Sequence, residues 1–182
     1  MKKLLFSLWV CVTVLLAIYF CAFEYCRNRA YRDIEFIDCS GDKFKADDGD
    51  SLYCSGKYVR ILGIDTPETK HPEHGISFDQ TFGSKAKEYA TKVLSAAKTI
   101  TLAVKRGEAD KYDRLLAHVL IDGHLFAPIM IRAGLAYETI EEYGDDNFSP
   151  YAAEIMQAWG EIEKPLPFEN PHDWREKNQA GR

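Results

Sequence analysis

The chain has 182 residues, of which 46% are hydrophobic and 28% are charged, and its formal net charge is −5. This length and composition are those of one ordinary globular domain with short extensions, and they exclude a disordered, fibrous or repeat protein. The acidic balance also argues against a protein that clamps nucleic acid non-specifically, because a broad basic face supplies most of the affinity in that mode of binding.

The chain opens with an apolar segment, Leu4 to Phe23, that carries no charge and has basic residues on both sides. About 20 residues are long enough to cross a hydrocarbon core of roughly 30 Å as a helix. A cleavable signal peptide has a shorter apolar core and small residues at its cut site, whereas residues 18–23 are mostly bulky. We therefore expect residues 1–30 to contain an N-terminal hydrophobic helix that serves as an uncleaved signal anchor. A cleaved signal peptide and a buried core helix are the alternatives.

The basic residues beside this segment bear on where the remaining chain lies. Because they occur on both sides, the positive-inside rule leaves the orientation open. We favour export, which gives a single-pass membrane anchor with an extracytoplasmic domain, or a secreted protein if the segment is cleaved. Cys39 and Cys54 lie in the domain, and an exported domain can pair them, although two unpaired thiols fit the sequence equally well.

Residues 31–164 are predicted to form one α+β domain, followed by a polar C-terminal tail over residues 165–182. Without residues 1–30, which hold four of the 23 basic and one of the 28 acidic residues, the net charge is −8. Apolar and alternating segments predict five short strands that close into a small antiparallel barrel, and helical spacing of apolar residues predicts about three helices. The expected strands are residues 34–46, 51–54, 59–64, 99–106 and 115–121, and the expected helices are residues 84–97, 125–132 and a last helix that begins at Ser149-Pro150.

The stretch from Val59 to Thr69 places several reactive side chains at the end of one predicted strand. Thr66-Pro67 must end that strand, because proline lacks the donor that a strand ladder needs. Asp65 and Glu68 therefore project into the following loop, where carboxylates can bind a hard divalent cation or take a proton from water. The nearby guanidinium of Arg60 can pair with a phosphate through two parallel hydrogen bonds. Taken alone, the stretch fits a surface ion pair beside a turn equally well.

Two further polar clusters are Asp48-Gly49-Asp50 and Asp110-Lys111-Tyr112-Asp113-Arg114. Each alone fits a common turn or a solvated loop. In this order, with the Val59 stretch between them, they resemble the staphylococcal-nuclease-like (thermonuclease) family. The family's hallmark segments look like Asp-Gly-Asp-Thr, then Val-Arg-x-x-x-x-Asp-Thr-Pro-Glu, then Asp-Lys-Tyr-Gly-Arg. The resemblance covers residues 34–160.

The resemblance implies an OB-fold barrel that carries a calcium-dependent phosphodiesterase site for DNA and RNA. Carried over by motif, the carboxylates of Asp50 and Asp65 and the carbonyl of Thr66 would bind Ca²⁺. Asp48 would lie behind these ligands. Calcium accepts several oxygen ligands in flexible geometry, so this set of donors is adequate for it.

The same resemblance assigns the catalytic roles. Glu68 would activate the attacking water, and Arg60 and Arg114 would bind the phosphate. Lys111 and Tyr112 would contact a terminal phosphate of the substrate. In-line attack builds negative charge on the phosphoryl oxygens, which a divalent ion and two guanidinium groups stabilise more in the transition state than in the ground state.

The chain departs from the family pattern in three places. Ser51 replaces the threonine that follows the second aspartate, and Asp113 replaces the glycine before Arg114. The second change puts a negative charge beside a phosphate-binding guanidinium. Residues 138–142 are mostly acidic where well-known members carry tyrosines for base stacking, so base contacts and substrate preference stay open.

We expect a monomeric calcium-dependent endonuclease with nucleic acid as its substrate. A non-catalytic OB-fold module that binds nucleic acid or protein at the cell envelope is the main alternative, and a phosphodiesterase for another phosphodiester is a weaker one. The combination of Glu68 with paired aspartates and arginines favours the enzyme, because a binding module has no physical need for a group that activates water.

Overall fold

The computed structural model describes residues 13–22, 34–110, 113–145 and 148–179. The chain forms two compact units, Met1–Asp33 and Ile34–Arg182. In the first unit residues 13–22 are helical and exposed. None of the helices in the described ranges is both long enough and apolar enough to cross a bilayer. The predicted N-terminal hydrophobic helix is therefore not confirmed, and residues 4–12 and 23 of that segment lie outside the described ranges.

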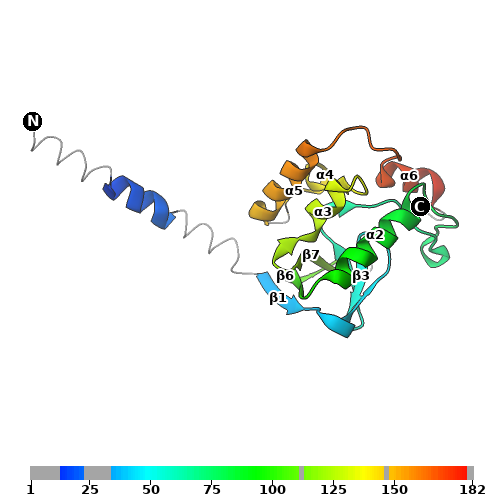
Figure 1. Ribbon diagram of the computed structural model, residues 1–182, viewed down its shortest axis with the longest axis horizontal. Coiled ribbons are helices and arrows are strands. Elements are labelled where there is room, and N and C mark those ends of the chain that lie inside the picture. The colour runs from blue at the N-terminus through cyan, green and yellow to red at the C-terminus, as the bar shows by residue number, and fades with distance from the viewer. Residues whose placement is uncertain (1–12, 23–33, 111–112, 146–147, 180–182) are drawn as a thin grey trace, which may run out of the picture. The chain divides into compact units, whose positions relative to one another are not determined.

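The second unit is built on one main sheet (Figure 1). Its strand order is β1-β6-β7-β4-β3-β2, and β8 pairs with β7. All neighbours are antiparallel except β4 and β7, which run parallel. The strands are β1 (Ile34–Asp38), β2 (Phe44–Ala46), β3 (Ser51–Cys54), β4 (Lys57–Ile61), β6 (Ile100–Ala109), β7 (Leu115–Ile121) and β8 (His124–Leu125).

The two ends of this sheet are continuous in the chain. β1 and β2 are separated only by residues 39–43, which include the 3₁₀ turn Gly41–Lys43. The expected strand 34–46 is therefore two strands that lie at opposite ends of the strand order. The expected strand 59–64 is likewise divided, because β4 ends at Ile61 and β5 (Ile64–Asp65) pairs instead with β9 (Tyr137–Glu138).

The α+β class is confirmed, and the three expected helices are present as α2 (Gly83–Ala96), α3 (Phe126–Arg132) and α5 (Ser149–Glu161). Two further helices, α4 (Ile140–Tyr143) and α6 (Pro171–Asn178), correct the expected number. The expectation of a purely antiparallel sheet is also wrong, because the chain returns from β4 through β5, α2 and β6, and β7 then runs parallel to β4. Figure 1 shows α6 beside one end of α2.

The core lies between the sheet and its helices. α2 buries Ala86, Ala90 and Leu94, as its apolar periodicity predicts. The strands, α3 and α5 contribute Leu52, Val59, Ile61, Leu102, Met130, Ile131, Ile155 and Ala158. Cys39 and Cys54 form a disulfide with their Cα atoms 5.6 Å apart, which resolves the pairing that the sequence left open.

Candidate active site

Two of the three predicted polar segments, Asp48-Gly49-Asp50 and the Val59 stretch, meet where β3 begins and where β4 and β5 end. In the register of β3 and β4, Ser51 lies opposite Arg60, so Asp50 sits at the start of β3 beside that arginine. The Ile61 amide donates a hydrogen bond of 2.9 Å to the Asp50 carbonyl and continues this pairing by one step. Asp65 is the last residue of β5. The β3–β4 pairing thus places Asp50 beside Arg60, and the turn after β4 returns Asp65 to the same arginine, so two carboxylates 15 residues apart in the chain meet there.

Arg60 bridges these two carboxylates. One of its terminal nitrogens pairs with Asp50, and the other donates to Asp65 Oδ1 at 2.8 Å and to the Ile64 carbonyl at 3.1 Å. Both aspartates are buried. Burial raises the pKa of Asp65, but Arg60 and then Arg175 outweigh it and hold that pKa below its usual value. Burial likewise lowers the pKa of Arg60, and the charges of Asp50 and Asp65 reverse this effect.

The turn around Gly49 brings the Asp50 carboxylate against the backbone of Thr66. The Thr66 amide donates to Asp50 Oδ2 at 2.7 Å. A Cβ atom on Gly49 would lie 2.6 Å from Thr66 Oγ1, so this approach requires glycine. Asp48 Oδ1 accepts from the Asp50 amide at 3.1 Å, and burial together with the charges of Asp50 and Glu68 raises the pKa of Asp48 well above its usual value.

Glu68 is held through its backbone by Gln80, a residue that the sequence did not single out. The Glu68 amide donates to Gln80 Oε1 at 3.1 Å, and the Gln80 amide donates to the Glu68 carbonyl at 2.9 Å. A side chain on Gly83 would overlap the Glu68 carbonyl oxygen, so glycine at the start of α2 allows the loop to pack there. Burial raises the pKa of Glu68, and Arg175 opposes that rise.

Arg175 of α6 reaches this cluster from the other end of the chain. It donates to Asp65 Oδ1 at 3.0 Å and to Asp65 Oδ2 at 2.6 Å, and it also pairs with Glu68. Sequence reasoning missed this residue because it lies in the segment expected to be a polar tail. The available signal was an aromatic residue, Trp174, directly before an arginine in an otherwise polar stretch.

The predicted phosphate-binding loop is described only in part, because Lys111 and Tyr112 lie outside the described residues. Arg114 donates to Asp110 Oδ2 at 2.7 Å and lies over the ring of Tyr58 on β4, 6.0 Å from its centroid. Asp113 has φ of 60°, a left-handed conformation that aspartate tolerates better than most residues. Aspartate thus adopts here a conformation natural to the glycine expected from the family pattern.

The acidic stretch 138–142 has a structural use. Glu138 Oε2 accepts hydrogen bonds from the amides of Ile140 and Glu141 and so caps α4. Tyr137 packs against Trp159 and Phe168, with ring centroids 5.4 and 5.6 Å apart. These contacts assign Tyr137 to packing, whereas the Tyr143 side chain is exposed.

The donor set agrees with a hard divalent cation in its chemistry. Asp50, Asp65 and the Thr66 backbone offer carboxylate and carbonyl oxygens, and one guanidinium already bridges both carboxylates, so they converge on a common cation. Over the ranges that the structure covers, however, no group of three or more His, Cys, Asp or Glu side chains is arranged to hold a metal ion. In this conformation Arg60 and Arg175 supply the positive charge that the carboxylates need.

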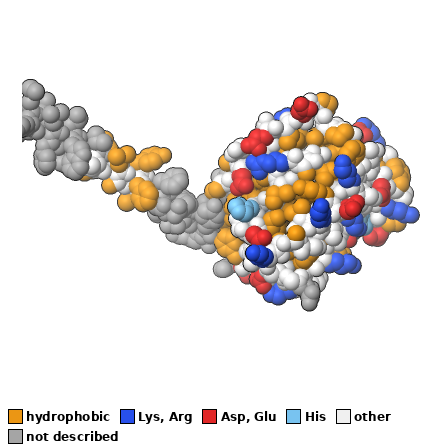
Figure 2. Space-filling model, in the orientation of Figure 1, with side chains coloured by type: hydrophobic (Ala, Val, Ile, Leu, Met, Phe, Trp, Pro, Cys, Tyr) orange, Lys and Arg blue, Asp and Glu red, His pale blue; other side chains and the backbone are white. Residues whose placement is uncertain are grey.

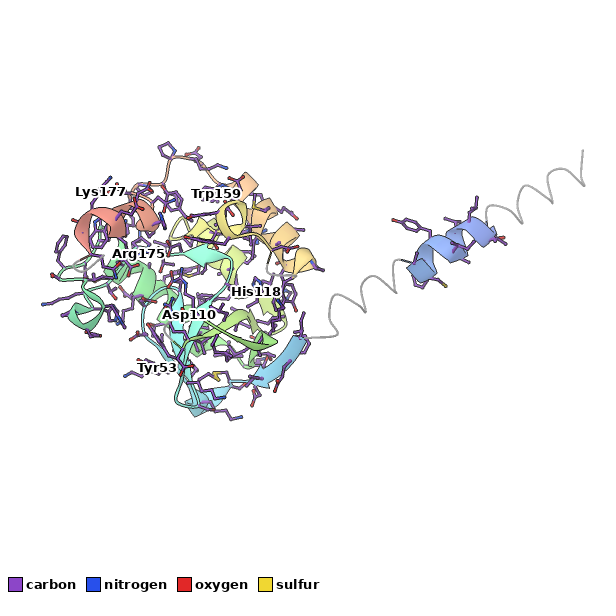
Figure 3. The ribbon with its side chains drawn as sticks, turned by 180° about the vertical axis from the view of Figure 1, so that it is seen from behind. Tyr53, Asp110, His118, Trp159, Arg175 and Lys177 are labelled. Atoms are coloured by element: carbon purple, nitrogen blue, oxygen red, sulfur yellow. A yellow bond between two sulfur atoms is a disulfide. The ribbon has the colours of Figure 1, made fainter. Side chains whose placement is uncertain are left out.

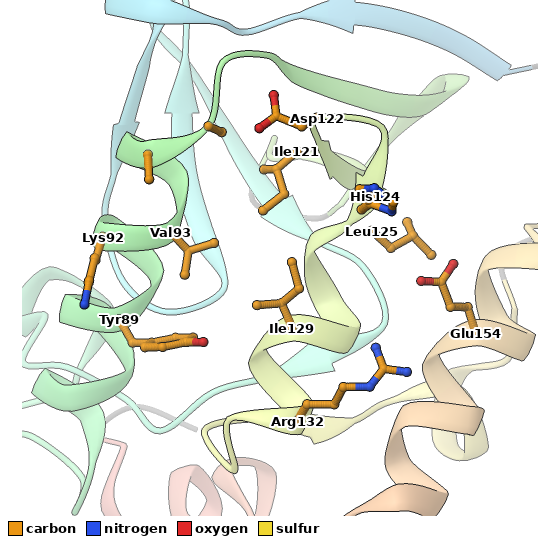
Figure 4. A pocket seen from close by; sticks show the side chains of 12 residues that line it. Tyr89, Lys92, Val93, Ile121, Asp122, His124, Leu125, Ile129, Arg132 and Glu154 are labelled. Carbon is orange, nitrogen blue, oxygen red and sulfur yellow. The ribbon is translucent and has the colours of Figure 1, made fainter.

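A separate apolar groove of about 630 Å³ contains none of the predicted site residues (Figure 4). It is lined from α2 by Tyr89 and Val93, from α3 by Ile129 and Arg132, and from α5 by Glu154. Figure 2 shows a broad apolar area on this face, with charged side chains around it.

Comparison with known proteins identifies the relatives of the chain. The family described as Staphylococcal nuclease homologue matches residues 58–160. The SPbeta prophage-derived endonuclease YokF of Bacillus subtilis (strain 168) is 33% identical over 120 residues, which cover 61% of this chain and 39% of YokF. Endonuclease YncB of the same organism is 34% identical over 110 residues, covering 56% and 51% of the two chains. A thermonuclease of Staphylococcus hyicus is 32% identical over 93 residues, covering 49% and 53%. The chain spans roughly half or less of the length of these relatives.

Proposed function

The chain belongs to the staphylococcal nuclease homologue family, and on that premise we propose that it is a calcium-dependent endonuclease that hydrolyses phosphodiester bonds in DNA and RNA. The observation that carries this proposal is the convergence of Asp50 and Asp65 on Arg60, and of Asp65 and Glu68 on Arg175, beside the ends of β4 and β5. Buried carboxylates with perturbed pKa values are typical of catalytic sites. Relatives that are named endonucleases and a thermonuclease support the same reaction.

The metal ligands in this proposal are the carboxylates of Asp50 and Asp65 and the carbonyl of Thr66. A bound Ca²⁺ supplies positive charge that stabilises the phosphoryl oxygens as negative charge develops on them. The hydrogen bond from the Thr66 amide to Asp50 holds two of these residues together. Asp48 supports the turn through its bond to the Asp50 amide.

Glu68 takes the proton of the attacking water. Its raised pKa brings it closer to neutral pH than an ordinary glutamate, where a general base is most effective. Arg60 and Arg114 bind the phosphate, and Lys111 and Tyr112 contact a terminal phosphate. For Arg60 this role requires its guanidinium to exchange an aspartate for a phosphate oxygen, two partners that suit the same planar donor fork.

The family and the strand order support a five-stranded OB-fold barrel. In this barrel β1 and β2 count as one strand interrupted by residues 39–43, which join the two ends of the strand order. The other four strands are β3, β4, β6 and β7. The disulfide between Cys39 and Cys54 supports an oxidising compartment, because such bonds are rare in the cytosol. We propose a monomeric domain outside the cytoplasm, either anchored by residues 1–30 or released after their cleavage.

The test is the replacement of Glu68 by glutamine in the full-length protein. Glu68→Gln keeps the size of the side chain and removes the base, so cleavage of single-stranded DNA in calcium is expected to fall by about 10²–10⁴-fold. Chelator should abolish wild-type activity. A matched control is Glu88→Gln, which makes the same chemical change at an exposed position on α2. If the wild type is folded but as inert as Glu68→Gln, the enzyme hypothesis is wrong, and the protein is a non-catalytic binding module.

A further inference from the structure

Residues 165–179 are fixed to the domain by apolar contacts. Leu166, Phe168 and Trp174 are all buried. The Phe168 ring packs against Phe82 at 5.5 Å between centroids, and the Trp174 ring meets Phe78 edge to face at 5.4 Å. Burying aromatic side chains of this size removes a large apolar area from water and stabilises these contacts. The segment is therefore a packed part of the domain.

Hydrogen bonds fix the same segment beside the Glu68 loop. Gln80 Nε2 donates to the Glu169 carbonyl at 2.7 Å, and Gln80 is also the residue that holds the Glu68 backbone. The Gln179 side chain donates to the His74 carbonyl at 2.7 Å. One buried glutamine thus ties Glu68 and the start of the C-terminal segment together.

Helix α6 begins at a defined point and aims two adjacent side chains inward. The Asn170 side chain accepts from the His172 amide at 2.9 Å, and Pro171 occupies the first turn, where its missing donor costs nothing. Trp174 anchors the helix, and Arg175 reaches Asp65 and Glu68. Figure 3 shows Arg175 on the side of α6 toward the strands and Lys177 away from them.

The contacts of Arg175 differ from those of an ordinary surface cation. Its side chain is 16% exposed and pairs with the carboxylates of Asp65 and Glu68, which are 6% and 13% exposed, whereas Lys177 on the same helix is 64% exposed and pairs with exposed Glu169. Within the described part of the chain, the ion pairs of Glu68 are with Arg175 alone. A buried carboxylate that loses its cation is destabilised in its charged form.

We propose that Arg175 is a positioning residue of the nuclease site, holding the carboxylates of Asp65 and Glu68 in fixed relative positions. This inference rests on the proposed function. A guanidinium suits the role because its planar fork can hold both Asp65 oxygens while a nitrogen also reaches Glu68. The C-terminal segment is then part of the active site, and the site is assembled from both ends of the domain.

The experiment compares Arg175→Ala, Arg175→Lys and Lys177→Ala in the full-length protein with single-stranded DNA and calcium. Arg175→Ala is expected to lower kcat by about 10–100-fold, the usual effect of losing a residue that orients a catalytic group, while KM stays within about threefold. Arg175→Lys should recover part of kcat, because it keeps the charge without the fork. Lys177→Ala, which removes a cation from the exposed side of α6, should match the wild type.

A second measurement does not depend on activity. In chelator, Arg175→Ala should melt below Lys177→Ala, because only the first variant leaves Glu68 without its ion pair and removes one of the two cations beside Asp65. Circular dichroism at the assay temperature establishes that each variant is folded.

Each outcome has a definite meaning. If folded Arg175→Ala has the kcat of the wild type, the inference is wrong but the proposed nuclease function stands. If its kcat is higher than that of the wild type, the inference is also wrong, because α6 then obstructs the site. Equal melting temperatures for Arg175→Ala and Lys177→Ala in chelator overturn the contact itself. If the wild type is folded but inert, the proposed function fails and the inference fails with it.

Discussion

The carboxylate cluster, formed by Asp50, Asp65 and Glu68, and the interior around His118 both contain ionisable side chains with little exposure to water. Burial is offset by nearby cations at the cluster, whereas in the interior it favours the neutral form of the side chain. At the cluster, Asp50 pairs with Arg60, and Asp65 pairs with both Arg60 and Arg175. The pKa of Asp65 is lowered. In the interior, His118 of β7 is 1% exposed, and its Nδ1 has no hydrogen-bond partner within the described residues. The rings of Phe148 and Tyr151 lie 4.7 and 5.2 Å away, and burial lowers the pKa of His118 to about 4.

The difference shows what each region requires. A core needs apolar packing, so a buried histidine is tolerated there by remaining neutral. The proposed phosphodiesterase site needs ionised carboxylates in a place of low polarity, so it must bury cations beside them. Arg60 and Arg175, which lie far apart in the sequence, both contact Asp65 and supply these cations. Removal of one charged side chain from the cluster should therefore lower the stability of the protein far more than replacement of the neutral His118.

The largest effect on stability is expected for Arg60→Met. The substitution keeps an unbranched side chain but leaves Asp50 and Asp65 without their bridging cation, and breaking a buried pair in this way costs about 3–5 kcal/mol. Denaturant unfolding in chelator measures the loss. Lys57→Met removes a charge from an exposed position of the same strand and should cost much less. Equal losses in the two variants would mean that the aspartates do not depend on Arg60.

His118 should give a smaller effect that depends on pH. Because its folded pKa of about 4 lies below its usual 6.5, the unfolded chain takes up a proton that the folded chain does not. Its contribution is thus fully present above pH 6.5 and is lost as pH falls toward 4, by up to about 3 kcal/mol. Over this window the free energy of unfolding of the wild type should fall relative to that of His118→Leu as the pH is lowered. His124→Leu, the same change at an exposed position, should follow the wild type. Parallel pH curves for the wild type and His118→Leu would show that His118 titrates normally.

The local part of the site was predictable, and the distant part was not. Asp65, Thr66 and Glu68 are close in sequence, and proline at position 67 announces the end of their strand, so a short motif contains most of the information. Arg175 contacts Asp65 across a separation of 110 residues. A single arginine in a short helix gives no periodic pattern, so only the packing of Trp174 reveals where it points.

The fold shows the same division. The apolar stripe of α2 follows from residues that are three and four positions apart, and it was predicted correctly. The parallel pairing of β4 with β7 joins segments more than 50 residues apart, with Val59 opposite Leu115. Such a pairing depends on the route of the whole chain between the two strands, including α2, and neither strand carries a local sign of it.

The smallest effect is expected where an ion pair is exposed. Arg132 Nε donates to Glu161 Oε2 at 2.7 Å and links α3 with α5, but the two side chains are 43% and 44% exposed. Water already solvates both groups, so their attraction is offset by the cost of ordering two long side chains. Arg132→Gln should therefore unfold at nearly the same denaturant concentration as the wild type, at low and at high salt. A loss comparable to that of Arg60→Met would contradict this expectation. It would mean that the contribution of an ion pair to stability depends on its distance and not on its burial, because the 2.7 Å Arg132–Glu161 contact is as short as the 2.8 Å contact of Arg60 with Asp65.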